Sequence, residues 1–308
     1  MTREEKNKKQ RIYLNKLQLH EKLKKRLTII FKIIFFLSLF IFSFFLYTRY
    51  IATSGLVVKE EKIESTNLPN SFNGFKIVQF SDLHYGSTIF IEQLENIVSQ
   101  INLRKPDIVI FTGDFIDKNY ILKDNEKIEI INLLKKINTT CGKYAVKGNH
   151  DYDTTHFDDI LSVCGFTVLN NNYDLIYYKG MDPILLVGVG SDIKNDFNKD
   201  LAFNYFKLEG NNPNIYTVAI LHEPDLINNI LTTYNVDLAL SGHSHNGQVR
   251  IPFYGSIVTI NGAKKYHEEF YQINNTKLYI SGGLGTSSYP IRLFNRPSFN
   301  FFRLTKTN

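Results

Sequence analysis

The chain has 308 residues, of which 43% are apolar, and this is enough to build a large hydrophobic core and excludes a disordered chain. The net charge of +6 would suit a nucleic-acid-binding protein, but residues 1–26 hold ten Lys or Arg against three Glu. The remaining residues carry 26 basic and 27 acidic side chains, so we expect no nucleic-acid partner for the main body.

After the basic segment 1–26, residues 27–48 are almost wholly apolar, with Lys32 as the only charge. As a helix they would span roughly 33 Å, the thickness of a bilayer core. We therefore predict a single-pass transmembrane anchor, and the positive-inside rule keeps 1–26 as a cytoplasmic tail and places the chain after Arg49 outside the cell membrane. A cleaved signal peptide is the alternative, with small residues at 52–55, but the long apolar run favours an uncleaved anchor.

Residues 49–72 are mixed in charge, and we interpret them as a linker with a short edge strand at 56–59. Residues 73–308 alternate between strand and helix patterns, which favours a mainly parallel α/β core. Strands are predicted at 76–80, 107–111, 144–146, 166–169, 173–178, 184–189, 216–221, 237–240, 247–252, 256–260, 268–273 and 277–281. Helices are predicted at 89–101, 123–137, 155–163, 200–207 and 225–231.

Two cysteines, Cys141 and Cys164, form neither a CxxC motif nor a metal-binding pair. They can be two small, partly buried thiols. Each also stands just before a predicted strand, and in a right-handed strand–helix–strand unit those strand starts lie at one edge of the sheet. A disulfide is therefore the alternative, and it would require an oxidising compartment.

Five predicted strands end in His, Asp or Asn clusters. The strands are followed by Asp82-Leu83-His84, by Gly113-Asp114 with Asp117, by Gly148-Asn149-His150-Asp151, by His222, and by Gly242-His243-Ser244-His245. Ligands of open α/β sheets bind beyond the carboxyl ends of the strands, so these side chains should share one rim. Five of the eight histidines fall in these clusters, whereas His20, His156 and His267 are interpreted as structural.

Imidazole, carboxylate and amide oxygen together form a mixed ligand set that suits Mn, Fe or Zn better than calcium. Two divalent ions would bring four positive charges, and Asp82 and Asp114 would cancel two of them. The remaining charge would attract a phosphate ester. Two ions can also share a hydroxide that attacks phosphorus in line. The sequence thus predicts a two-metal hydrolytic site.

The ordered set D-x-H, G-D-x-x-D, G-N-H-D, an isolated His and G-H-x-H resembles the calcineurin-like metallophosphoesterase superfamily, from about Asn73 to Leu304. The anchor, Gly282–Thr286 and Pro290-Ile291-Arg292 resemble its bacterial membrane-associated YkuE/YaeI-like branch. The resemblance implies a four-layer α/β/β/α sandwich after one transmembrane helix. It also implies seven metal ligands: Asp82, His84 and His245 for one ion, Asn149, His222 and His243 for the other, and Asp114 between them.

The same resemblance assigns catalytic roles. His150 matches the histidine that approaches the substrate phosphate and protonates the leaving oxygen, and Asp117 matches the carboxylate that orients it; the alternative for Asp117 is a helix N-cap. Asp151 caps the next helix or supports its loop. Arg292 either contacts the substrate phosphate through its guanidinium or forms a surface or inter-strand salt bridge.

We therefore expect a membrane-anchored, dinuclear-metal phosphoesterase, more specifically a phosphodiesterase, whose substrate is lipid-linked or a nucleotide. Two alternatives use the same fold. A non-catalytic metal-binding scaffold would lose ligands, and none is lost here; a two-metal nuclease is disfavoured because the main body is close to neutral.

Overall fold

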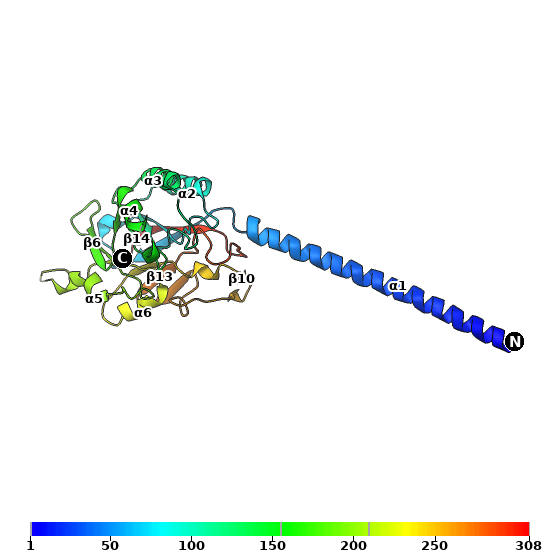
Figure 1. The fold of residues 1–308 in the computed structure, drawn as a ribbon. Coiled ribbons are helices and arrows are strands. Elements are labelled where there is room, and N and C mark those ends of the chain that lie inside the picture. The colour runs from blue at the N-terminus through cyan, green and yellow to red at the C-terminus, as the bar shows by residue number, and fades with distance from the viewer. Residues whose placement is uncertain (1, 155, 209, 308) are drawn as a thin grey trace. The chain divides into compact units, whose positions relative to one another are not determined.

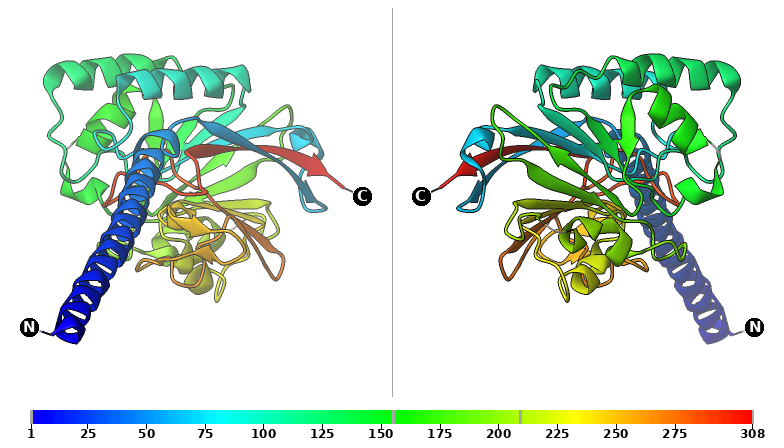
Figure 2. Two further views of the ribbon diagram at one scale, coloured as in Figure 1. Left: turned by 90° about the vertical axis from the view of Figure 1, so that its right-hand side faces the viewer. Right: turned by 90° about the vertical axis from the view of Figure 1, so that its left-hand side faces the viewer.

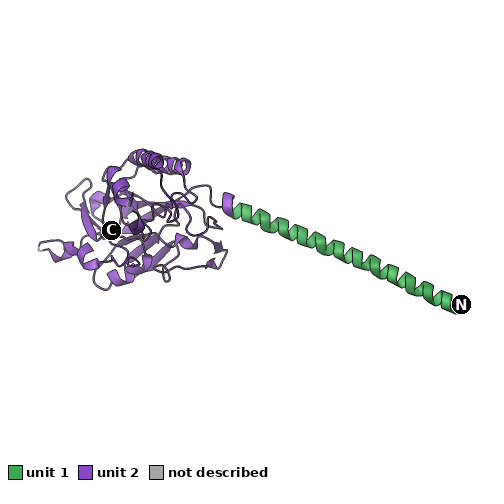
Figure 3. Cartoon of the chain, viewed as in Figure 1, with its two compact units in different colours: residues 1–48 green, residues 49–308 purple. Residues whose placement is uncertain are grey.

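The computed structural model describes residues 2–154, 156–208 and 210–307, so residues 1, 155, 209 and 308 of the predicted ranges lie outside the described residues. The chain divides into two compact units, residues 1–48 and 49–308 (Figure 3).

The first unit is one long helix, α1 (Arg3–Leu46), which continues into a π-helical turn at Tyr47–Ile51. At its start the backbone N–H of Thr2 donates to the Glu5 carboxylate at 3.0 Å, which caps the first turn. The helix is long and apolar enough to cross a membrane, which makes it a candidate span. From Arg3 onward, the basic segment 1–26 is helical throughout.

The second unit contains two six-stranded sheets (Figures 1 and 2). The first has the order β1 (Val57–Ser65), β14 (Ser298–Lys306), β2 (Lys76–Phe80), β3 (Ile108–Phe111), β4 (Lys143–Ala145), β5 (Phe166–Val168). Its neighbouring strands are parallel except β14 and β2.

The second sheet has the order β12 (Phe270–Ile273), β13 (Thr276–Ile280), β9 (Leu238–Ser241), β8 (Thr217–Ile220), β7 (Ile184–Gly188), β6 (Asn172–Ile176). Its four central strands are parallel, and both edge strands pair antiparallel. A separate small hairpin joins β10 (Arg250–Ile251) to β11 (Gly255–Ser256).

Three apolar cores hold four layers together. Helices α2 (Ile91–Leu103), α3 (Asp124–Lys135) and α4 (His156–Val163) pack on the outer face of the first sheet, and α5 (Lys199–Ala202) and α6 (Ile227–Ile230) pack on the outer face of the second. A third core, which includes Ile110 and Val218, fills the space between the sheets. The predicted α/β/β/α sandwich is therefore confirmed.

The predicted elements differ from the structure chiefly in three segments, at 49–72, at 247–260 and at 298–306. The segment 49–72, expected to hold only a short edge strand, contains the nine-residue β1, which pairs with β14 over its whole length. The strand β14 lies inside the first sheet and is missing from the predicted strands. The hairpin strands expected at 247–252 and 256–260 shorten to two residues each.

Both cysteines are free thiols, so the alternative of a disulfide is wrong. Cys164 is buried in the core under α2–α4, whereas Cys141 packs against the core between the sheets. The first sheet separates these two cores, and this is why the shared edge of the two strand starts does not bring the sulfur atoms together.

Candidate metal centre

The strand-end clusters meet beyond the carboxyl ends of β2, β3, β8 and β9, where six side chains form two compact groups. One group is Asp82, His84 and His245, and the other is Asp114, His222 and His243. In each group, one potential ligand atom from every residue lies within 4.8 Å of the others, and all six residues are buried. The sequence prediction that these residues converge agrees with this geometry.

In the first group, nitrogen atoms and a carboxylate oxygen point at one another. The Nε2 atoms of His84 and His245 are 3.2 Å apart, and His245 Nε2 is 3.4 Å from Asp82 Oδ1. The other ring nitrogen of each histidine, Nδ1, is buried without a hydrogen-bond partner among the described residues.

In the second group, backbone carbonyls determine which ring nitrogens carry hydrogen. His222 Nδ1 lies 2.7 Å from Thr112 O, and His243 Nε2 lies 2.7 Å from Asn261 O. Since a carbonyl only accepts, these nitrogens must donate. In the neutral rings, His222 Nε2 and His243 Nδ1 then face each other as lone pairs only 3.1 Å apart. A proton or a cation between them removes this repulsion, so the residues fit a metal ion.

Asp114 joins the two groups. Its Oδ2 lies 3.5 Å from His84 Nε2 in the first group and 3.3 Å from His222 Nε2 in the second. One carboxylate oxygen thus contacts both groups, as a bridging ligand must. The remaining predicted ligand is Asn149. Its amide Oδ1 is buried with no hydrogen-bond partner in the described chain, so this oxygen is available to bind a metal ion.

Burial sets most protonation states. It lowers the pKa of His84 to about 4 and that of His243 to about 3, and it raises the pKa of Asp82 to about 7. For His222, burial opposes the charged ring, but the adjacent carboxylates of Asp114 and Asp82 outweigh it and raise the pKa well above its usual value. In the metal-free protein, His222 is therefore protonated, and its proton lies where the two facing imidazole nitrogens would otherwise hold a cation.

The backbone of this site is strained. Five of the seven predicted ligands have left-handed φ angles, which non-glycine residues seldom adopt: Asp82 (50°), His84 (40°), Asp114 (61°), His243 (68°) and His245 (48°). Each such residue costs about 1–3 kcal/mol and persists only where surrounding contacts enforce it. These left-handed angles gather at the strand ends that carry the predicted ligands, which indicates a functional site that lowers the stability of the fold.

Asp151 supplies one of those enforcing contacts. Its carboxylate accepts three backbone N–H groups, from Asp114, Phe115 and Gly148, each at 2.8 Å. It thereby ties the loop after β3 to the loop after β4, so the interpretation that Asp151 supports its loop is confirmed. A side chain at Gly148 would collide with the carboxylate of Asp114, and glycine is what allows this approach.

His150 borders the cluster and is less buried than the six residues of the two groups. Its Nε2 lies 3.8 Å from Asp114 Oδ2, and its backbone N–H donates to Asp114 Oδ1 at 2.9 Å. The sequence predicts that Asp117 orients His150, but within the described chain no hydrogen bond or ion pair joins them. Asp117 Oδ2 instead lies 3.9 Å from His84 Nδ1, and its Oδ1 accepts the backbone N–H of Asn119.

Arg292 does not face the site in the way that a phosphate contact requires. Its side chain is fully buried, and its guanidinium donates to the carbonyls of Gly282, Gly283, Gly285 and Asn295. Burial with these acceptors makes Arg292 the support of the loop behind Asp82 and His245, which Gly283 approaches closely. The predicted substrate contact is corrected to this structural role.

Several supporting groups are absent from the sequence prediction. The carbonyls of Thr112 and Asn261 fix two imidazole rings, and a backbone carbonyl leaves no signal in a sequence. Glu223 is buried, accepts the hydroxyl of Ser191 and lies 3.4 Å from the backbone N of Asp192. Its position directly after His222 is the one available signal.

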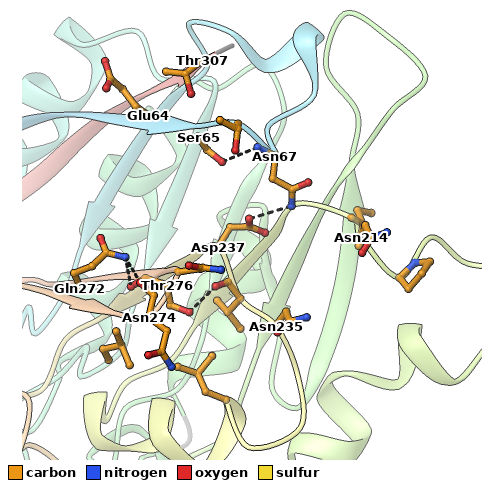
Figure 4. A pocket seen from close by; sticks show the side chains of 17 residues that line it. Glu64, Ser65, Asn67, Asn214, Asn235, Asp237, Gln272, Asn274, Thr276 and Thr307 are labelled. Carbon is orange, nitrogen blue, oxygen red and sulfur yellow. Dashed lines mark hydrogen bonds between the residues drawn. The ribbon is translucent and has the colours of Figure 1, made fainter.

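A large cavity lies at the other end of the strands. A space of about 770 Å³, rich in amide and hydroxyl side chains, opens beside the starts of β9 and β13, where Asn67, Asp237 and Asn274 line it (Figure 4). It contains none of the metal-ligand candidates. This cavity therefore does not coincide with the candidate metal centre, which is identified by the ligand geometry.

Comparisons with known proteins agree with this geometry. Residues 75–247 match the family model of the calcineurin-like phosphoesterases. Over 269 residues the chain is 36% identical to the uncharacterized metallophosphoesterase YkuE of Bacillus subtilis (strain 168), covering 85% of this chain and 90% of that protein. It is 26% identical to a transmembrane protein with metallophosphoesterase domain from Danio rerio, covering 81% of this chain and 59% of that protein.

Among solved structures, the Haemophilus influenzae NAD nucleotidase NadN aligns with a TM-score of 0.48 and 15% identity, covering 68% of this chain and 45% of that one. The family match and the similarity to YkuE, together with the two ligand groups, establish the family. The chain belongs to the calcineurin-like phosphoesterases.

Proposed function

We propose that this protein is a membrane-anchored phosphoesterase with a two-metal centre, and that it hydrolyses phosphodiesters. The position of Asp114 carries the proposal, because its Oδ2 contacts an imidazole of each ligand group. Two adjacent sites that share one carboxylate are what a two-ion clamp on a phosphoryl group requires.

Seven ligand residues would divide between two ions: Asp82, His84 and His245 would hold one, Asn149, His222 and His243 the other, with Asp114 between them. When bound, the ions supply Lewis acidity that activates water and neutralises charge on the phosphoryl oxygens. The carbonyls behind His222 and His243 keep the correct ring nitrogens turned inward. This mixed nitrogen and oxygen ligand set suits Mn, Fe or Zn.

His150 acts on the leaving group. Its ring stands at the edge of the cluster, 3.8 Å from Asp114, where it reaches a bound ester and delivers a proton to the departing oxygen. The contact with His84 makes Asp117 a positioning residue for that ring rather than for His150. Diester preference is supported by Arg292, because its guanidinium is occupied by carbonyls and adds no positive charge for the second negative charge of a monoester.

Residues 27–48 anchor the protein, with the basic tail in the cytoplasm and residues 49–308 outside the cell membrane. The apolar helix and the surplus of Lys and Arg before it support this orientation. A reporter fused after the last residue should be active only outside the cytoplasm. A cytoplasmic signal would reverse the assigned topology.

The full chain, purified in detergent and loaded with Mn, should bind two ions and hydrolyse a nitrophenyl phosphodiester. Asn149→Ala and His150→Ala should both abolish most of this activity, and only Asn149→Ala should lower the metal content. Two bound ions without hydrolysis in the unmodified chain would make it a non-catalytic scaffold. Cleavage of single-stranded DNA in preference to the small diester would make it a nuclease.

A further inference from the structure

A strongly exposed apolar hairpin stands beside the candidate metal centre. Residues 251–260, which include the β10–β11 turn, are called the apolar hairpin below. Its exposed large side chains are Ile251, Phe253, Tyr254, Ile257, Val258 and Ile260. Phe253 at the turn is fully exposed (111%), with a left-handed φ of 68°, and Phe294 next to the hairpin is 62% exposed. Soluble proteins rarely expose so many apolar side chains in one segment, and such a patch indicates binding to an apolar partner.

The apolar hairpin is tied to the metal centre at both ends. Before it, the guanidinium of Arg250 donates to Asn246 O at 2.7 Å, and Asn246 directly follows His245. After it, the carbonyl of Asn261 accepts from His243 Nε2 at 2.7 Å. Whatever surface receives the hairpin therefore also lies next to the metal centre.

The hairpin is also linked to the segment that leaves the predicted span. The backbone N–H of Arg250 donates to Leu293 O at 3.0 Å, and a few residues later Pro297 O accepts from Val57 N at 2.9 Å. Val57 stands nine residues after the end of the predicted span at residue 48. Nine residues reach at most about 30 Å, so Val57 stays within that distance of the end of the predicted span.

The charge around the hairpin suits an anionic lipid surface. Residues 249–265 and 284–297 contain no Asp or Glu, and they contain five basic residues: Arg250, Lys264, Lys265, Arg292 and Arg296. Arg250 is paired with Glu268, Arg292 is buried, and the Asp225 carboxylate lies against the backbone of Lys264 and Lys265. Counting Asp225, the exposed cations Lys264, Lys265 and Arg296 leave a surplus of two positive charges for lipid headgroups. An apolar tip with basic flanks is the pattern of interfacial membrane insertion.

We propose that the apolar hairpin inserts into the outer surface of the bilayer that holds the anchor, and that it presents the metal centre to phosphoesters of membrane lipids. This substrate class rests on the phosphoesterase function proposed above. The membrane docking itself does not, because it follows from the exposure, the linkages and the charge of the hairpin.

The chain contains no tryptophan, so one introduced tryptophan reports its own environment. Phe253→Trp in the full chain, placed in nanodiscs of phosphatidylcholine and phosphatidylglycerol, should lose about half or more of its emission when the lipids carry bromine. Met181→Trp is the matched control: Met181 is 87% exposed and lies shortly before the amino end of β7. Its emission should not change.

Equal emission from Phe253→Trp with and without bromine would overturn the docking. A blue-shifted but unquenched emission would overturn it as well, since the hairpin would then be covered by protein, such as a second copy of the chain.

A second measurement tests the substrate class. The triple variant Phe253→Ser, Tyr254→Ser and Val258→Ser should lower kcat/KM for a nitrophenyl-labelled phospholipid in nanodiscs about tenfold, because the buried apolar area is lost. Hydrolysis of the soluble nitrophenyl diester should stay unchanged. Equal losses on both substrates, or no loss on the lipid, would overturn the lipid assignment. Quenching of Phe253→Trp in a chain that hydrolyses neither ester would retain the docking and remove the phosphoesterase function.

Discussion

Aspartates stand at both ends of the parallel strands, buried at Asp107 and Asp114 and half-buried at Asp237, but their surroundings differ. At the amino ends, Asp107 accepts the backbone N–H of Lys76 at 2.8 Å and the hydroxyl of Thr140 at 3.0 Å. Asp237 likewise accepts the backbone N–H of Thr217 at 2.8 Å and, from Asn67, an amide N–H at 3.0 Å. Fixed donors satisfy both oxygens of each carboxylate, and these aspartates fasten one strand to the next.

At the carboxyl ends, Asp151 is also satisfied by backbone N–H groups, but Asp114 has a fixed donor for only one of its two oxygens. Asp114 Oδ1 accepts a backbone N–H, but its Oδ2 faces three imidazole nitrogens at 3.3 to 3.8 Å. None of these three ring nitrogens is a donor fixed by the backbone, so the charge on Oδ2 lacks a permanent partner within the described chain. The comparison teaches that burial alone does not mark a reactive carboxylate; the absence of a built-in donor does.

The strongest test of this difference replaces one aspartate at each end of the strands by the neutral asparagine. Asp114→Asn should lower kcat/KM for a nitrophenyl phosphodiester about 10³-fold or more, because the metal ions supply several kcal/mol of transition-state stabilisation. Asp107→Asn should lower the free energy of unfolding by about 1–3 kcal/mol, since a buried hydrogen bond is lost, and leave the metal content intact. Elemental analysis and denaturant unfolding separate the two outcomes. Similar metal contents in both variants would refute the distinction.

A variant of Asp151 tests how far the metal centre depends on the hydrogen bonds that hold its loops together. Asp151→Asn keeps one acceptor oxygen but cannot satisfy three backbone N–H groups. We expect activity to fall roughly 10–100-fold, as for other supports of metal ligands. The free energy of unfolding should fall by about 2–3 kcal/mol. An unchanged pH-independent kcat in a destabilised variant would show that Asp151 only holds the fold.

Removal of metal should affect one end of the strands alone. At a free-metal concentration about 100 times the Kd, each bound ion adds about 2.7 kcal/mol to the free energy of unfolding. Chelation should therefore lower Tm by about 5–10 °C per site. Asp114→Asn should reduce this shift, whereas Asp107→Asn should retain it in full. A calorimetric scan of the three proteins with and without chelator gives the answer.

Much of this arrangement could be predicted from the sequence, because it follows from topology. Parallel strands bring their carboxyl ends to one edge, so polar clusters after five strands had to meet if the strands were correctly identified. The strand β14 escaped detection for a physical reason. It lies between β1 and β2, where Phe299, Phe302 and Leu304 are all buried, and a strand covered on both faces loses the alternation that identifies edge strands.

Side-chain direction within the loops could not be predicted. The segment after Asp114 runs beside Tyr85, with Tyr85 N donating to Phe115 O and Asp117 N donating to Tyr85 O. This pairing turns Asp117 toward His84 and away from His150. Spacing along the chain places Asp117 near the site, but only the pairing of two distant segments decides which imidazole it meets.

The smallest expected effect concerns Arg292, which a sequence pattern alone cannot assign to substrate or to structure. Arg292→Lys keeps the charge but cannot reach all four carbonyls that the planar guanidinium joins. We expect the free energy of unfolding to fall by about 1–2 kcal/mol, while KM for the phosphodiester stays unchanged. Arg303→Lys, at an exposed position on β14, is the matched control and should change neither quantity. A large rise in KM with an unchanged free energy of unfolding would instead show that Arg292 contacts the substrate phosphate. A purely structural role would change the free energy of unfolding first.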